Sequence, residues 1–427
     1  MTNRHRVAHV VRKYNPAEWG GTETYLAEMT KRLTQGEWGC DVYAPDAPEG
    51  PTMPDKALDP AVRLERYRAF LPFLASSERR RALIATAGNI ASLDLPVRLL
   101  RDRQISLVHL HTMGRIGGAV RAAMQWSGRA YIVAAHESIL TDAETPARNK
   151  ATRHARAIDL GAPLGALLRT GRVLDDAARV IVFNERERKA LERRIGSRAV
   201  RMDHGVDVER FVKGDAGRAK NIFPMLENHP VILAVGRLSF QKNQLLSLRA
   251  FARGASAEHR LVLAGAETDR GYRALLEEEA RALGIRERVV FLGNVPAAVL
   301  PDLYARADVV LAPSTQETFG LVVLEAWASK KPIIWAARSG LKDLADLLPA
   351  DSGVALPDDD VERWGRALDA LLTNSDKRKR IAEFGHSLVR RRFHWDGVAS
   401  KLATLYEEVL EEAQFRAPLP FSKFRIQ

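Results

Sequence analysis

The sequence predicts an α/β protein made of two doubly wound domains in tandem, each with a parallel sheet covered by helices. Short apolar segments alternate along the whole chain with amphipathic segments of helical period. The apolar segments are hydrophobic throughout, which is typical of parallel strands buried on both faces. The chain length of 427 residues is that of two domains rather than one.

The apolar segments that we expect to be strands are rich in Val, Ile and Leu. In the first half of the chain they are residues 6–11, 40–45, 105–111, 130–137 and 179–184. In the second half they are residues 231–237, 260–266, 289–295, 308–313 and 332–337. The amphipathic segments expected to be helices include residues 22–35, 273–284 and 360–374.

Charge and glycine content rise around residues 202–220, and the next strand begins at Val231. We therefore expect a first domain over residues 1–207 and a second over residues 208–395. Residues 396–427 would form a C-terminal helix and tail, and the proline-containing tail from Ala417 is expected to pack loosely.

The composition is that of a soluble globular protein, with 46% hydrophobic and 28% charged residues. The one cysteine, Cys40, excludes an intrachain disulfide, and neither a signal peptide nor a membrane span is evident. We therefore expect a cytoplasmic protein. The net charge of +12 fits an anionic ligand, but no zinc-finger spacing or aromatic-rich run indicates nucleic acid.

Ligands of open α/β sheets bind beyond the carboxyl ends of the strands, so the loops after the strands carry the candidate chemistry. After the first strand, Gly20 and Gly21 precede a helix, which allows close approach of backbone N–H groups to an anion. An ordinary turn explains the two glycines equally well, because their spacing matches neither the dinucleotide-binding glycine motif nor the Walker A loop.

Two further loops carry charge. GRLSFQKN places Arg237 and Lys242 after a strand, where two cations could bind a diphosphate, although solvated loop charges are the simpler alternative. PSTQETFGLVVLEAW places Glu317 before a helix that we expect to begin at residues 318–320, and Glu325 within an apolar run. A carboxylate in such a run needs partners, either ribose hydroxyls of a ligand or an Arg or amide of the protein.

These motifs, in this order, resemble the retaining GT-B glycosyltransferases of family 4: GGTE after the first strand, GRLSFQKN, and ETFGLVVLE. The similarity covers nearly the whole chain and is strongest from Val231 to Ser339. FHWDGVASKLATLYEEVL is similar to the family's closing helix, which crosses back to the first domain. The resemblance implies a GT-B fold with two Rossmann-like domains facing across a cleft, the first binding the acceptor and the second the nucleotide sugar.

The resemblance also implies roles for single residues. Glu325 would bind the ribose hydroxyls and Glu317 the donor sugar, while Arg237 and Lys242 would hold the diphosphate. Backbone groups would assist; these belong to Gly20, Gly21, Thr318, Phe319, Gly320 and Leu321. His136 matches a histidine near the donor sugar. Without the resemblance, His136 is better explained as a histidine at a strand end whose hydrogen bonds are made within the protein.

The chain departs from the family pattern at two places. His204 stands where many relatives have asparagine before Gly-Val-Asp, which puts a role for that loop in doubt, and Glu137 stands where many have aspartate after the histidine. Both changes could reshape the donor or acceptor pocket.

We expect same-face attack on a UDP- or GDP-sugar, with Arg237 and Lys242 stabilising the leaving diphosphate, and His136 and Glu317 among the catalytic residues. A covalent route would need a carboxylate beneath the anomeric carbon, and Glu317 is the one candidate by position. No metal and no cofactor is predicted. Asp358, Asp359 and Asp360 precede a helix and are better explained by helix capping.

The acceptor is left open between a saccharide, a lipid-linked sugar and a small molecule. Residues 63–103 mix Arg with Phe, Leu and Ile, which suits either a surface resting on anionic lipid at the inner face of the membrane or a pair of ordinary surface helices. Two other classes remain: a nucleotide-sugar 2-epimerase, which needs no acceptor, and a basic scaffold without catalysis, which leaves Glu325 unexplained.

Overall fold

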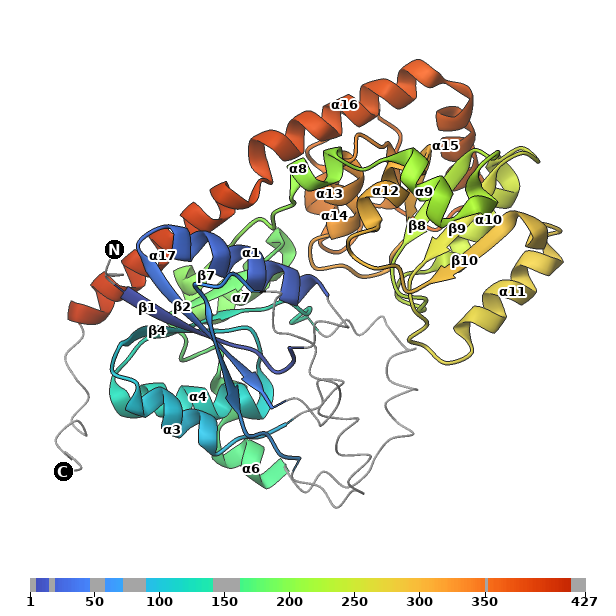
Figure 1. Ribbon diagram of the computed structural model, residues 1–427. Helices are drawn as coiled ribbons and strands as arrows, with labels where there is room; N and C mark the ends of the chain where they lie inside the picture. Colours follow the sequence, from blue (N-terminus) through green and yellow to red (C-terminus); the bar gives the residue numbers. More distant parts are fainter. Residues whose placement is uncertain are drawn as a thin grey trace. The chain divides into compact units, whose positions relative to one another are not determined.

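The chain folds into two compact units, which are described separately. The computed structural model (Figure 1) describes residues 5–14, 20–46, 58–71, 90–140, 162–349 and 352–415. One unit comprises residues 1–202 together with 398–427, and the other comprises residues 203–397. The first change of unit falls after Met202, five residues before the expected position at 207. The C-terminal tail from Ala417 lies outside the described residues.

The first unit is built on a parallel sheet of seven strands, ordered β3-β2-β1-β4-β5-β6-β7. The central strands are almost wholly buried, because most of their residues are apolar on both faces. The strands are β1 (His5–Val10), β2 (Trp38–Pro45), β3 (Arg63–Tyr67), β4 (Ile105–Leu110), β5 (Tyr131–Ala134), β6 (Arg179–Val182) and β7 (Ala199–Arg201).

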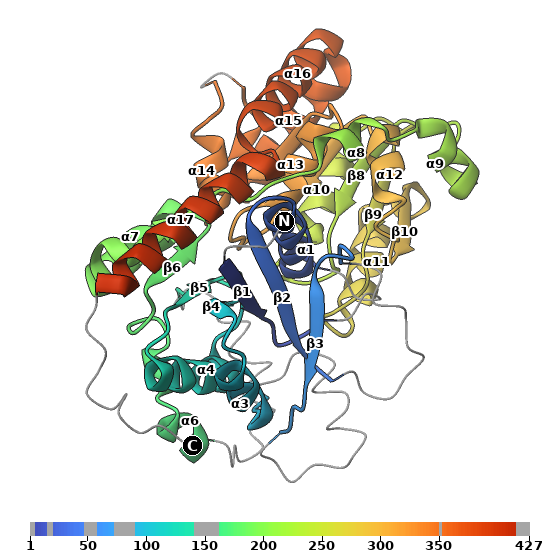
Figure 2. The ribbon, with the colours of Figure 1, turned by 60° about the vertical axis from the view of Figure 1, so that its left-hand side comes forward.

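Helices cover both faces of this sheet. Figures 1 and 2 show α3 and α4 on one face, with α1 and α17 on the other. The helices of this unit are α1 (Gly21–Gln35), α3 (Asp94–Arg101), α4 (Gly114–Ser127), α6 (Ala162–Leu167), α7 (Glu185–Ile195) and, from Val398 onward, α17 (Trp395–Phe415). On α17, buried Tyr406 contacts the sheet through His109, with 2.7 Å between Tyr406 Oη and His109 Nδ1. The predicted return of the C-terminal helix to the first domain is therefore confirmed.

The second unit has a six-stranded parallel sheet in the order β10-β9-β8-β11-β12-β13. Its strands are β8 (Val231–Val235), β9 (Arg260–Ala264), β10 (Val289–Gly293), β11 (Val309–Ala312), β12 (Ile333–Ala336) and β13 (Ala355–Leu356). Its helices are α8 (Val208–Val212), α9 (Ala216–Ile222), α10 (Gln244–Gly254), α11 (Tyr272–Ala282), α12 (Leu300–Arg306), α13 (Leu321–Ala328), α14 (Leu341–Ala345), α15 (Val361–Thr373) and α16 (Ser375–Arg392). This is the strand order of a doubly wound dinucleotide-binding sheet.

The structure corrects the interpretation of residues 63–103. This segment begins with an edge strand, β3, rather than a helix. It ends in the short helix α3, which buries Leu95 and Leu99 while the neighbouring Leu93 is 72% exposed. Residues 72–89, which carry most of the predicted amphipathic surface, lie outside the described residues. No helix in the described part of the chain is long and apolar enough to cross a membrane.

The aspartate run before α15 caps that helix, as predicted. The Asp360 carboxylate accepts hydrogen bonds from the amides of Glu362 at 3.0 Å and Arg363 at 3.3 Å. Asp358 forms an ion pair with Arg363, and Asp359 is likewise paired with an arginine. All three carboxylates therefore have partners within the protein.

Candidate functional site

The predicted donor-binding loops of the second unit meet at the centre of its sheet. Strands β8 and β11 are neighbours there although β9 and β10 lie between them in the chain. The crossovers on either side of this point run in opposite directions, which leaves room for a ligand beyond the strand ends. The loop 236–243 follows β8 and the loop 313–320 follows β11.

Gln241 joins these two loops into one structure. Its carbonyl oxygen accepts hydrogen bonds from the amide of Thr315 at 2.8 Å and from the Thr315 hydroxyl at 3.1 Å. The side-chain amide of Gln241 donates in turn to the carbonyl oxygen of Gln316 at 2.8 Å. The charged side chains on both loops are therefore carried by a single braced framework.

Lys242 and Glu317 form an ion pair across the loops, in which Lys242 Nζ donates to the Glu317 carboxylate. Their side chains are only 17% and 18% exposed. The Lys242 stem also runs over Gly236, where an added Cβ would lie 3.4 Å from Lys242 Cδ. The ammonium group therefore has little freedom, and its position is fixed before any ligand binds.

Arg237 contrasts with Lys242. Its backbone carbonyl oxygen accepts a hydrogen bond from Gln244 Nε2 at 2.9 Å, which holds the main chain in place. Its side chain is exposed, and within the described residues no carboxylate or carbonyl group contacts the guanidinium. An anion at the switch point would therefore find one anchored and one available cation.

Glu325 lies one turn into α13 and is half-buried. Its Oε2 accepts a hydrogen bond from the hydroxyl of buried Tyr304 at 2.8 Å, while Oε1 has no partner in the described part of the chain. Burial raises the pKa of the Glu325 carboxyl to about 6, although the Tyr304 hydrogen bond and the charges of Arg210 and Lys242 lower it. Within the described residues the protein therefore satisfies one of the two Glu325 carboxylate oxygens.

Helix α13 begins at Leu321, one residue after the predicted range of 318–320. Gly320 caps the helix with φ of 94°, a conformation that a glycine adopts without strain, and Leu321 is the first helical residue. The Phe319 side chain is buried, with its ring 5.8 Å from those of His204 and Phe393. Packing of Phe319 inward fixes the main chain of the turn.

Gly340 packs against the turn before α13, and a substitution of Gly340 tests the role of the turn. Its amide donates to the Glu317 carbonyl oxygen at 2.8 Å, and an added Cβ would lie 2.1 Å from the Thr318 carbonyl oxygen. We expect Gly340→Ala to displace the turn, to lower the free energy of unfolding by about 1–3 kcal/mol and to weaken anion binding. Chemical denaturation checks the first effect. Gly171→Ala is the control, since an added Cβ there meets no atom within 4 Å.

The remaining predicted site residues, Gly20, Gly21 and His136, belong to the first unit. The Gly20 amide donates to Glu23 Oε2 at 3.0 Å, so this amide already has an anionic partner, and Gly21 is the first residue of α1. His136 follows β5, with its Nε2 2.9 Å from His111 Nδ1 and its ring stacked on Phe183 at 5.2 Å. Its partners hold the ring in one orientation.

The two departures from the family pattern have local explanations. His204 is buried, packs on Trp395 with ring centroids 4.9 Å apart, and contacts the Gly205 carbonyl oxygen through Nδ1 at 3.1 Å. The glycine at position 205 leaves room for the Trp395 ring, because an added Cβ would lie 2.4 Å from that ring. Glu137 is exposed and forms an ion pair with Arg12. His204 therefore serves packing in this chain.

Sequence reasoning missed several residues of the site. Tyr304 and Arg210 lie on other helices, and nothing in their local sequence points to Glu325. Gln241 lies inside the GRLSFQKN motif and could have been noticed there. A group of buried histidines in the first unit was also missed, although alternating histidines on an apolar strand, as in HLH at residues 109–111, are a visible signal.

Two family models match the chain. "Glycosyl transferase 4-like domain" matches residues 20–204, and "Glycosyl transferases group 1" matches residues 217–387. The second match contains both predicted donor-binding loops, and the first contains Gly20, Gly21 and His136.

Relatives of known name are similar over part or most of the chain. D-inositol 3-phosphate glycosyltransferase 2 of Catenulispora acidiphila is 32% identical over 264 residues, which is 58% of this chain and 60% of that protein. The D-inositol 3-phosphate glycosyltransferase of Salinispora tropica is 28% identical over 419 residues, 93% of this chain and 83% of that protein. The match thus spans less than two thirds of the length of the Catenulispora protein.

Solved structures show the same fold. HepE of Anabaena, in complex with UDP and glucose, superposes with a TM-score of 0.71 at 18% identity and covers 95% of this chain and 100% of that one. Sucrose-phosphate synthase of Thermosynechococcus elongatus gives a TM-score of 0.72 at 20% identity, covering 96% and 100%. With two matching family models, a GT-B fold and the motifs in their expected loops, this chain belongs to the group 1, or family 4, glycosyltransferases.

Proposed function

We propose that the protein is a retaining glycosyltransferase, which moves a sugar from a UDP- or GDP-sugar to a hydroxyl group of a saccharide, lipid-linked or small-molecule acceptor. The observation that carries the proposal is the arrangement at the switch point of the second sheet. An exposed, unpaired Arg237 and a fixed Lys242 accompany Glu325, whose Oε1 lacks a partner in the described part of the chain. Two cations and an acceptor of hydroxyl protons suit a nucleoside diphosphate.

In the proposed reaction, Arg237 and Lys242 bind the diphosphate and stabilise the charge that develops on it as the bond to the sugar breaks. The acceptor hydroxyl attacks from the face that the diphosphate leaves, and its proton passes to a diphosphate oxygen. Glu317 is held in an ion pair with Lys242. That pairing reduces its nucleophilicity, so it supports the same-face route over a covalent intermediate.

We propose that this chemistry requires no metal and no cofactor, because Arg237 and Lys242 supply the positive charge that a diphosphate leaving group needs. Synthesis of a glycan, polysaccharide or glycolipid is the proposed setting. Peripheral contact with an anionic membrane is proposed on narrower grounds, namely that Leu93 and Val97 are exposed near Arg101 on α3.

Thermal unfolding with UDP-, GDP-, ADP- and TDP-sugars tests the proposal. A ligand at 100 times its dissociation constant stabilises the folded state by about 2.7 kcal/mol, so one nucleotide is expected to raise the Tm by several degrees. The shift is expected to be lost in Arg237→Ala and kept in Arg281→Ala, which removes an exposed arginine from α11. No shift with any nucleotide sugar would contradict the donor site. Conversion of the bound sugar nucleotide to its epimer without an acceptor would contradict the transferase.

A further inference from the structure

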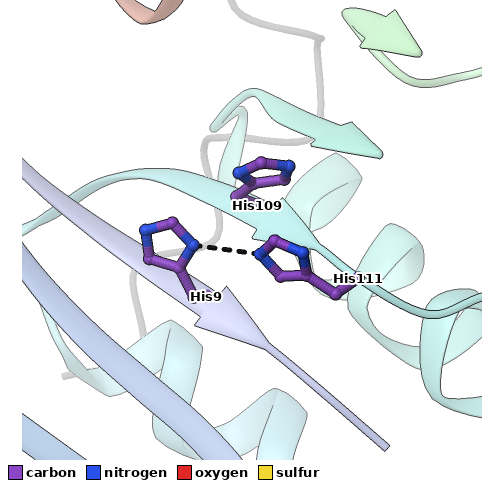
Figure 3. A group of neighbouring side chains, drawn as sticks. All are labelled: His9, His109 and His111. Carbon is purple, nitrogen blue, oxygen red and sulfur yellow. Dashed lines mark hydrogen bonds between the residues drawn. The ribbon is translucent and has the colours of Figure 1, made fainter. Parts of the chain in front are cut away.

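The first unit contains a group of three buried histidines that the proposed reaction does not use. His9 lies on β1, and His109 and His111 lie on or directly after β4 (Figure 3). His9 and His109 are register partners in the parallel ladder, and His111 is two residues further on, so all three side chains point to the same face of the sheet. Their exposed fractions are 0%, 0% and 6%.

The nitrogen atoms of these rings converge. One nitrogen from each ring lies within 4.8 Å of the other two. His9 Nδ1 is 3.0 Å from His111 Nε2, close to the separation of about 3.3 Å between two imidazole nitrogens that bind the same tetrahedral zinc ion. Because all three nitrogens lie within 4.8 Å of one another, the third ring needs to move by no more than about 1.5 Å to reach the same separation.

Two of the rings have their outer nitrogens already engaged. His109 Nδ1 is 2.7 Å from Tyr406 Oη, and His111 Nδ1 is 2.9 Å from His136 Nε2. Histidines that bind a metal characteristically donate their second ring N–H to such an outer partner, which sets the ring orientation. These outer partners occupy neither Nε2 of His109 nor Nε2 of His111.

Two nitrogen atoms of the group lack any hydrogen bond. His9 Nε2 and His109 Nε2 are both buried and have no partner in the described part of the chain. A buried polar atom without a hydrogen-bond partner lowers the stability of the folded state, and a bound ion would remove this loss at His109.

We propose that His9, His109 and His111 bind one divalent transition-metal ion, with Zn²⁺ as the preferred occupant. Imidazole nitrogens suit zinc, and three of them with one open position is a recurrent zinc arrangement. His9 Nδ1, His109 Nε2 and His111 Nε2 are the ligands, and the ion replaces the hydrogen bond between His9 and His111. His9 then carries its ring proton on Nε2, so that no proton is released. The ion ties β1 to β4 and, through His111, fixes the ring of His136.

Metal content and metal-dependent stability test this site. Untagged protein from zinc-supplemented cells is expected to hold about one zinc ion per chain by elemental analysis after gel filtration with a weak chelator. His9→Gln and His109→Gln are each expected to reduce the content at least about tenfold. His229→Gln, which alters a histidine of the second unit bonded to the Glu258 carbonyl oxygen, is expected to leave it unchanged.

A second measurement covers the case in which a variant fails to fold. Wild-type protein refolded with Zn²⁺ is expected to melt several degrees higher than protein refolded with chelator, and protein refolded with Co²⁺ to show the visible absorption of four-coordinate cobalt. Metal-free wild-type protein with no such shift and no saturable binding would overturn the proposal, as would zinc content equal in wild type and both variants. Zinc content is measured without any nucleotide sugar, so its outcome can be judged whether or not the donor site is confirmed.

Discussion

Replacing Arg237 by alanine is expected to lower the rate of nucleoside diphosphate release from the donor sugar by about 10²–10³-fold. The guanidinium has no partner in the described part of the unliganded chain, so its removal breaks no internal contact and leaves the fold intact. Its interaction strengthens as negative charge builds on the departing diphosphate. The turnover number should therefore fall in addition to the donor affinity.

Steady-state kinetics with the nucleotide sugar found by the thermal screen measures this effect. Arg281→Ala is the matched control, and equal melting temperatures of the two variants without ligand establish that both are folded. Lys242→Ala is a less direct comparison, because it also leaves Glu317 without its ion-pair partner. An Arg237→Ala enzyme within about threefold of wild type would remove Arg237 from the proposed charge stabilisation.

Replacing Glu325 by glutamine is expected to stabilise the free protein and to weaken donor binding. The folded-state pKa of Glu325 is about 6, against an ordinary value of 4.5. The folded state therefore binds more protons than the unfolded state between these values, and stability falls as pH rises from about 4.5 to about 6. Above that range the ionised carboxylate lowers the free energy of unfolding by up to about 2 kcal/mol. The loss is smaller than this limit because the Glu325 side chain is only half-buried.

The Glu325→Gln variant should not lose stability in this way as pH rises. Its free energy of unfolding should match that of wild type at pH 4.5 and exceed it by up to about 2 kcal/mol at pH 7.5. Donor affinity should drop by about 10–100-fold, because hydroxyl groups donate more strongly to a carboxylate than to an amide. Denaturant unfolding at several pH values and ligand-dependent melting measure the two effects.

Tyr304→Phe separates the two roles of Glu325. It removes the one donor to Oε2 and keeps the carboxylate, so stability should fall while the ligand-facing Oε1 is retained. A Glu325→Gln protein that is less stable than wild type at pH 7.5 and binds the donor equally well would show that Glu325 serves the fold alone.

The alternation of strands and helices in both units follows from the pattern of apolar residues along the chain. All ten predicted strands are present, because buried parallel strands are continuous runs of Val, Ile and Leu, which are readable without knowing their neighbours. Three strands of the described residues, β3, β7 and β13, were missed. Strand β3 has the sequence RLERY and lies at the edge of the sheet. Charged side chains are tolerated there because one side of an edge strand is solvated, so β3 contains no apolar run.

The sequence also indicated where most residues of the candidate donor site lie, since the charged residues follow strands directly and parallel strands bring the loops after them to one edge. Which of these residues contact one another depends on how the strands and helices pack. The bond between Lys242 and Glu317 joins positions 75 apart, and that between His9 and His111 joins positions 102 apart. Tyr406 reaches His109 from 297 residues away. Such contacts depend on strand order and on the return of α17, because local patterns specify period and burial but not which buried surfaces pair.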